Sequence, residues 1–253
     1  MSVQELRKAS EKINTYLRLR THPLGFKLFE TITEAKRVGW KPPNQLFICQ
    51  VINTARIHGR ALIMTAEDST CVFGAVSLGL TETPPRMASG EIFVKLGTVS
   101  DPEKAKEYQR CFSRLEPKYK AFAVKPLERT NFEPDALLLY GNSAQISLAL
   151  FAFSIRYGER LQLSMFGESA LCGGIAQAMT TGKPQISIPC FGERVYAGTA
   201  DDEILLTVPF PELPDLISGL ETLHKNGIKY PIPIAGCANT VEIASILKTD
   251  YKV

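Results

Sequence analysis

The sequence predicts an α/β protein, folded as one domain over residues 1–253, with a mixed sheet and helices packed on both faces. Three observations lead to this prediction. Apolar stretches typical of strands take turns with stretches whose apolar residues recur at helical spacing. No low-complexity linker interrupts this alternation, which is typical of α/β folds. A chain of 253 residues is also long enough to bury a substantial core.

The composition excludes several classes of protein. Apolar residues make up 45% of the chain and charged residues 22%, as in ordinary soluble proteins. The net charge is +3, and the basic residues are scattered, so a nucleic-acid-binding protein is not expected. The longest apolar run, over 146–155, is too short to cross a membrane. Because the first 20 residues lack the apolar core of a signal peptide, we expect a cytoplasmic protein that does not bind membranes.

The first elements follow from periodicity. Apolar residues at helical spacing predict an amphipathic helix over 3–19, and the alternating PLGFKLFE predicts a strand over 23–30. The segment 45–59, which carries Cys49, is expected to be a helix or a strand that leads into one. A strand over 61–66 follows.

The middle of the chain contains a clear helix start. Asp68, Ser69 and Thr70 are favourable cap residues, so a helix is expected to begin at about Cys71 and to end near Gly79. Next come a strand, a polar-faced helix with Cys111 in its middle, and a second strand, over 90–100, 101–115 and 119–128.

The second half repeats the alternation. The strands are expected over 133–142, 162–167, 185–192, 194–198 and 203–209. The helices between and after them are expected over 143–158, 171–182 and 211–227, the last with Gly227 as a left-handed cap. The proline-rich tail is left unassigned.

Free cysteines are the main chemical signal. In a reducing compartment the six cysteines are expected to be thiols rather than disulfides. Cys71 and Cys172 begin helices of small residues, where free backbone N–H groups favour a thiolate or a bound anion. Cys190 precedes Phe191 and Gly192, where a bare backbone lets a cofactor approach. With no C-x-x-C pair, simple packing of buried thiols stays the alternative.

Several motifs resemble one family. They are P-L-G-F-K-L near the N-terminus, C-x-x-x-x-x-A-R at Cys49, T-C-V-F-G-A at Cys71, E-P-D-A-L-L-L-Y, A-L-C-G-G, and S-I-P-C-F-G-E-R. Together they are similar to domain-of-unknown-function family 169, over residues of about 23–220. The resemblance implies no reaction. It implies that Cys49, Cys71, Cys172 and Cys190 belong to the family pattern, whereas Cys111 and Cys237 do not.

Four thiolates suit one iron-sulfur cluster, such as 4Fe-4S, or one tetrahedral zinc ion as the alternative metal. We therefore expect a metal site formed by Cys49, Cys71, Cys172 and Cys190. Arg56, Arg194 and Gly192 are expected to bind a small anionic substrate, because the arginine fork suits carboxylates and phosphates. A solvated helix end at Arg56 and an exposed hairpin turn at 192–194 are the alternatives.

Two functions stay open on these grounds. The first is redox or lyase-type chemistry at an iron-sulfur cluster, with a small-molecule substrate or an electron-transfer partner. The second is a non-catalytic small-molecule-binding protein, whose pocket is lined by Phe73, Phe166, Phe191 and apolar cysteines. A structural zinc site is less attractive, because a chain of this size does not need a metal to fold. The sequence does not decide between an enzyme and a binding protein, nor does it indicate an oligomeric state.

Overall fold

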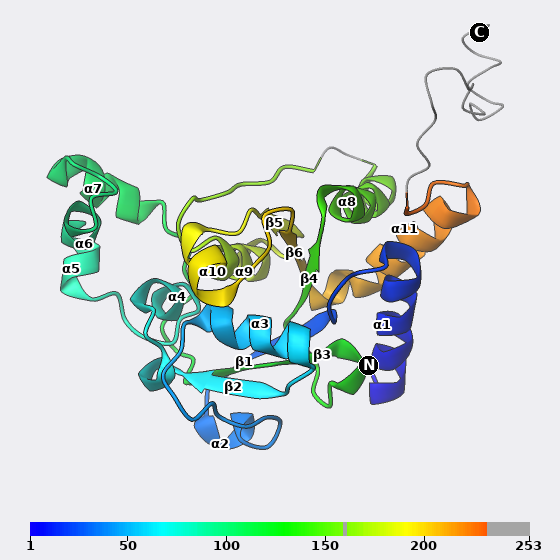
Figure 1. The fold of residues 1–253 in the computed structure, drawn as a ribbon, viewed down its shortest axis with the longest axis horizontal. Coiled ribbons are helices and arrows are strands. Elements are labelled where there is room, and N and C mark those ends of the chain that lie inside the picture. Colours follow the sequence, from blue (N-terminus) through cyan, green and yellow to red (C-terminus); the bar gives the residue numbers. More distant parts are fainter. Residues whose placement is uncertain (159–160, 232–253) are drawn as a thin grey trace, which may run out of the picture.

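The computed structural model describes residues 1–158 and 161–231, which are arranged around one six-stranded sheet (Figure 1). The strand order is β2-β3-β1-β4-β6-β5. The strands are β1 Leu24–Phe29, β2 Leu62–Thr65, β3 Ala121–Pro126, β4 Ala136–Gly141, β5 Gln185–Ser187 and β6 Ile204–Pro209. All ladders between these described strands are antiparallel, and isolated parallel bridges join Trp40 to Leu62 and Leu46 to Ser69.

Nearly every residue of the four central strands is buried, which shows that the sheet is covered on both faces. In β4, Leu138 and Tyr140 belong to one apolar cluster, while Leu137 and Leu139 belong to another. Successive side chains of a strand point to opposite faces, so two clusters mean two covered faces. The predicted α/β class with helices on both faces is confirmed. The predicted mixed sheet is wrong in one respect, because every ladder between the described strands is antiparallel.

One face carries the helices that form the candidate site. They are α3 (Ile48–His58), α4 (Val72–Ser77), α9 (Ala170–Thr181) and α10 (Phe191–Ala197). Apolar side chains of α3, α4 and α9 pack on a core that includes the stacked rings of Phe26 and Phe122. α10 lies against α3, where the Asn53 side chain donates a hydrogen bond to the Ala197 carbonyl oxygen.

The other face is covered by α1 (Val3–Leu17), α8 (Ser143–Tyr157) and α11 (Leu213–Lys225). α8 and α11 pack closely where Gly219 meets Ala152. A Cβ atom on Gly219 would lie 2.5 Å from the Ala152 carbonyl oxygen, so only glycine permits this approach. The predicted helices over 3–19, 143–158 and 211–227 are thus confirmed.

A helical extension projects from one end of the sheet (Figure 1). It consists of α5 (Pro85–Ala88), α6 (Glu91–Lys95) and α7 (Pro102–Arg110), joined by a cluster of aromatic rings around the fully buried Phe93. The strand predicted over 90–100 was wrong, because Gly90 adopts φ +82 and starts α6 instead. So short an apolar run does not distinguish a strand from a helix.

Four other predictions of local structure were wrong. Residues 162–167 form no regular element, and the strand expected over 194–198 is part of α10. The strand predicted over 185–192 ends at Ser187, two residues before Pro189, which cannot donate to a ladder. Cys111 is the exposed C-cap of α7 and not a packed mid-helix residue. The short remaining helix α2 spans Ile32–Ala35, and the tail from residue 232 lies outside the described residues.

Within the described part of the chain, every helix is too short or too polar to cross a bilayer.

Candidate functional site

A pocket of about 380 Å³ lies where the N-terminal ends of α3, α4, α9 and α10 meet. Its wall is completed by Leu96 and Thr98, which follow α6, and by residues 167–169, which precede α9. Beyond the cysteines, the wall consists mainly of apolar and aromatic side chains. This size and lining are typical of small-molecule sites.

The structure brings the four predicted cysteines together at this pocket. Each occupies the start of a different helix: Cys49 is the second residue of α3, Cys71 the N-cap of α4, Cys172 the third residue of α9, and Cys190 the N-cap of α10. Their assignment as metal ligands stays a prediction. Cys111 lies outside the pocket lining, and Cys237 lies outside the described residues.

Small residues allow this convergence. A Cβ atom on Gly74 of α4 would lie 2.9 Å from the Cys172 sulfur, so a side chain there would push α4 and α9 apart. The Gly74 N–H also donates to Cys71 Sγ over 3.4 Å, which fixes that thiol at the helix start. The small-residue helices that begin near Cys71 and Cys172 therefore pack directly against each other.

Burial favours the protonated form of three of the pocket thiols. Burial raises the pKa of Cys49 and of Cys71, and raises that of Cys172 well above the ordinary value. The nearness of other acidic groups, Cys71, Cys49 and Glu193 among them, adds to the effect on Cys172, because two negative charges side by side are unfavourable. Three of the four thiols therefore resist ionisation until a cation or another compensating group arrives.

Glu193 is a pocket residue that the sequence analysis missed. Its side chain is buried, with 1% of the residue exposed, and its carboxylate accepts hydrogen bonds from the Cys190 N–H and the Tyr140 hydroxyl, both over 3.2 Å. Burial raises its pKa. The spacing C-x-x-E before a helix was the available signal, because a glutamate three residues after a cap bonds back to the cap N–H.

Arg56 lies outside the pocket lining. Its guanidinium is buried and forms two hydrogen bonds of 2.6 and 2.8 Å with the carboxylate of Glu203. It also lies 4.0 Å from the centre of the Tyr140 ring. Its charge is therefore already paired, and its predicted contact with a substrate stays a prediction.

Arg194 and Gly192 occupy different positions, although they are close in sequence. Gly192 lines the pocket, whereas Arg194 does not, and the Arg194 side chain donates to the Ala200 carbonyl oxygen over 2.8 Å. Both residues belong to α10 rather than to an exposed hairpin turn. Substrate binding by Gly192 or Arg194 stays a prediction.

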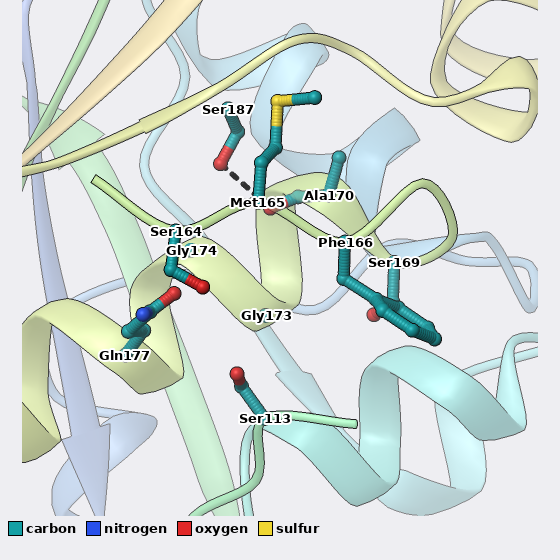
Figure 2. A pocket seen from close by; sticks show the side chains of 10 residues that line it. All are labelled: Ser113, Ser164, Met165, Phe166, Ser169, Ala170, Gly173, Gly174, Gln177 and Ser187. Atoms are coloured by element: carbon teal, nitrogen blue, oxygen red, sulfur yellow. Dashed lines mark hydrogen bonds between the residues drawn. The ribbon is translucent and has the colours of Figure 1, made fainter. Parts of the chain in front are cut away.

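Two of the three aromatic residues expected in a pocket line this one. Phe73 and Phe191 belong to the wall, while Phe166 borders a smaller cavity on the other side of the α9 start. Figure 2 shows that cavity, with Ser113, Ser164 and Gln177 around it and the Ser187 hydroxyl bonded to the Ala170 carbonyl oxygen. With about 10 Å³ available, it has room for about one water molecule.

The thiols do not form a ready-made site for a single metal ion. Among residues 1–158 and 161–231, no three side chains of His, Cys, Asp or Glu are grouped so that they hold one ion. The four thiols therefore line a cavity but are not grouped closely enough to bind one ion together.

Comparison with known proteins supports the resemblance seen in the sequence. Residues 12–219 match the family described as DUF169, uncharacterised ArCR. A similar protein is the uncharacterised protein MJ0308 of Methanocaldococcus jannaschii, with 28% identity over 233 residues, covering 87% of this chain and 96% of that protein. No solved structure gives a significant match.

Proposed function

Because the chain belongs to the DUF169 family, whose description names no reaction, we propose a function from the pocket itself: it binds an iron-sulfur cluster that serves redox or lyase-type chemistry on a small molecule. The observation that carries this proposal is the presence of four cysteines from four separate chain segments in one pocket wall, namely Cys49, Cys71, Cys172 and Cys190.

The arrangement suits a cluster better than a single ion. The four ligands of a cubane bind four different irons, so they surround a volume and lie farther apart than the ligands of one tetrahedral zinc ion. The described thiols surround a pocket and are not grouped around one point. Zinc is therefore the second choice of metal.

The local charges support thiolate ligands once iron is present. Cys49 and Cys172 lie in the first turns of α3 and α9, which have 11 and 12 residues. The free N–H groups and dipole of such helices stabilise negative charge at their N-terminal ends. Iron supplies the positive charge that the metal-free pocket lacks, and binding releases the thiol protons.

The number of bound thiols decides the chemistry. A cluster held by all four cysteines suits electron transfer to a protein partner. A cluster held by three leaves one iron open to a substrate, which is the arrangement that Lewis-acid catalysis uses. An anionic substrate is not part of this proposal, since neither Arg56 nor Arg194 lines the pocket.

The test compares two serine variants after anaerobic reconstitution with iron and sulfide. Cys172→Ser removes a buried thiol of the pocket, and Cys111→Ser removes an exposed thiol outside it. The proposal expects a brown protein with visible absorbance for the wild type and Cys111→Ser, and a large loss of iron and sulfide for Cys172→Ser. Equal iron content in both variants would overturn it, and zinc is measured in the same samples.

The second candidate is a non-catalytic small-molecule-binding protein. The raised pKa values of Cys49, Cys71 and Cys172 favour it, because neutral thiols are apolar enough to line a ligand pocket. It predicts that ligand binding needs no metal and that Cys172→Ser leaves iron content unchanged at zero.

A further inference from the structure

We propose that the pocket binds a planar, apolar small molecule with an uncharged or cationic hydrogen-bond donor, and that the carboxyl group of Glu168 anchors this donor. The inference rests on the proposed function in one respect: it assigns the four thiols to the cluster and the rest of the wall to the ligand.

The remaining wall is apolar and aromatic. The rings of Phe47 and Tyr196 stack with their centres 4.1 Å apart and an angle of 5° between their planes, which makes a flat platform at one side. Phe73 of α4 and Leu96, which follows α6, also line the pocket. Phe191 lines it too, and this residue is 79% exposed. Planar rings gain most from such surfaces by stacking and by removal of apolar area from water.

The charges of the wall disfavour an anionic ligand. Among the described residues that line the pocket, Glu168 and Glu193 have acidic side chains, and none is a Lys, Arg or His. The two arginines nearest in sequence to the pocket residues are committed elsewhere, Arg56 to Glu203 and Arg194 to the Ala200 carbonyl oxygen. A carboxylate or phosphate would lose its hydration and face two acidic side chains.

One acceptor atom in the wall lacks a partner. Glu168 Oε2 is buried and has no hydrogen-bond partner among the described residues. The Thr98 hydroxyl lies near this carboxyl group, but it donates its hydrogen to the Phe93 carbonyl oxygen. Both oxygens of Glu193, by contrast, are bonded, to Tyr140 and to the Cys190 N–H. Buried polar atoms are nearly always satisfied, so an unpaired one in a pocket wall indicates a missing donor. A ligand N–H or O–H group is the donor that the pocket itself can supply.

The turn that holds Glu168 is fixed at Ser169. Ser169, the next residue, has φ +53, a left-handed conformation that residues other than glycine seldom adopt. Its hydroxyl lies 3.2 Å from that of Ser77 in α4. Such strained positions concentrate at ligand sites, where surrounding contacts hold them in place.

The volume sets the size of the ligand. An apolar cavity of about 150 Å³ accommodates benzene. The cavity of about 380 Å³ is large enough for a two-ring aromatic molecule next to the thiols. Three naphthalene derivatives with the same ring system therefore serve as probes: 2-naphthylmethylamine, 2-naphthylmethanol and 2-naphthoate.

The experiment measures the Kd of each probe by titration calorimetry for the wild type, Glu168→Gln and Glu11→Gln, with and without reconstituted iron. Glu11 lies exposed on α1, on the opposite face of the sheet, and is the matched control. We expect the amine and the alcohol to bind at least about tenfold more tightly than the naphthoate. Glu168→Gln should weaken the amine about tenfold, and Glu11→Gln should leave its Kd unchanged.

Three results would overturn the inference: tighter binding of the naphthoate, an amine Kd unaffected by Glu168→Gln, or no binding of any probe. Circular dichroism shows whether Glu168→Gln is folded, and this isosteric change touches no described hydrogen bond of Oε2. Failure of the cluster proposal looks different, because it leaves the protein without iron while the probes still bind. If the cluster forms and the present inference is wrong, the protein contains iron but does not bind the probes.

Discussion

The thiols of Cys49, Cys71 and Cys172 are weak nucleophiles as long as they keep their protons. Burial raises the pKa of each, and a thiol is a poor nucleophile and a poor metal ligand while it keeps its proton. Cys111, by contrast, is exposed at the end of α7. The two kinds of cysteine should therefore differ in reactivity.

Alkylation with iodoacetamide at pH 7 should modify Cys111 much faster than Cys172. The raised pKa leaves little Cys172 thiolate at this pH, and because the thiolate fraction grows as pH increases towards that pKa, its modification should accelerate in alkaline buffer. Peptide mass spectrometry measures both rates. In guanidinium chloride the rates should converge, and equal rates in the folded protein would contradict this account.

Arg56 and Glu203 form a buried ion pair beneath the pocket helices. Burial acts to raise the pKa of Glu203, but the hydrogen bonds from Arg56 and the Ala200 N–H outweigh it and hold that pKa below its ordinary value. A carboxyl group whose pKa is lowered on folding stabilises the fold above its unfolded pKa, and this contribution is lost as the pH falls through the folded value.

Arg56→Met should reduce the free energy of unfolding at pH 7 by about 3–5 kcal/mol, because it leaves the Glu203 charge buried without a partner. Urea denaturation measures the difference, which should shrink as the pH falls through the lowered pKa of Glu203 and its carboxylate becomes protonated. Arg20→Met removes an exposed pair with Asp202 and should have a much smaller effect. A loss for Arg56→Met that does not depend on pH would exclude the ion pair as its cause.

Helices and strands with strong periodicity could be predicted, and short apolar segments could not. The 3–19 and 211–227 helices kept their apolar stripe over several turns, and they appear as α1 and α11. The segments 90–100 and 194–198 carry apolar residues without a lasting period, and their helical form depends on Gly90 and on the Cys190 cap. Contacts with the rest of the protein decide such segments.

The start of α9 depends on two adjacent glycines with different roles. A Cβ atom on Gly174 would lie 2.2 Å from the Ser187 hydroxyl oxygen, which is bonded to the Ala170 carbonyl. A Cβ atom on Gly173 would meet no described atom closer than 3.9 Å. α9 therefore packs against β5 through Gly174, while the position of Gly173 leaves room for a methyl group.

Gly174→Ala should lower the free energy of unfolding by about 1–3 kcal/mol, the usual effect of overpacking. Gly173→Ala should be neutral or stabilising by up to about 1 kcal/mol, because alanine favours the helix more than glycine does. Thermal denaturation of both variants compares them directly. The packing of α9 on β5 would be contradicted by equal stabilities.

Some residues of the candidate site could be predicted from the sequence, and others could not. The four cysteines could be singled out from their helix starts and from the family resemblance, and they do line one pocket. Glu168 could not, because its importance comes from one buried carboxyl oxygen without a partner. The C-x-x-E spacing could have identified Glu193 as a cap residue, but not its burial or its contact with Tyr140. Arg56 was expected to bind an anionic substrate or to lie at a solvated helix end, yet its side chain lies in the core.

The convergence of four distant segments on one pocket is the basis of the proposed cluster, and metal analysis tests it most directly. The measurement is the content of iron, acid-labile sulfide and zinc, with a visible spectrum, for protein purified without oxygen. The account predicts about four iron atoms and four sulfides per chain, as in a cubane held by cysteine thiolates. A colourless, stably folded protein without iron would contradict it and return the thiols to the role of apolar pocket lining.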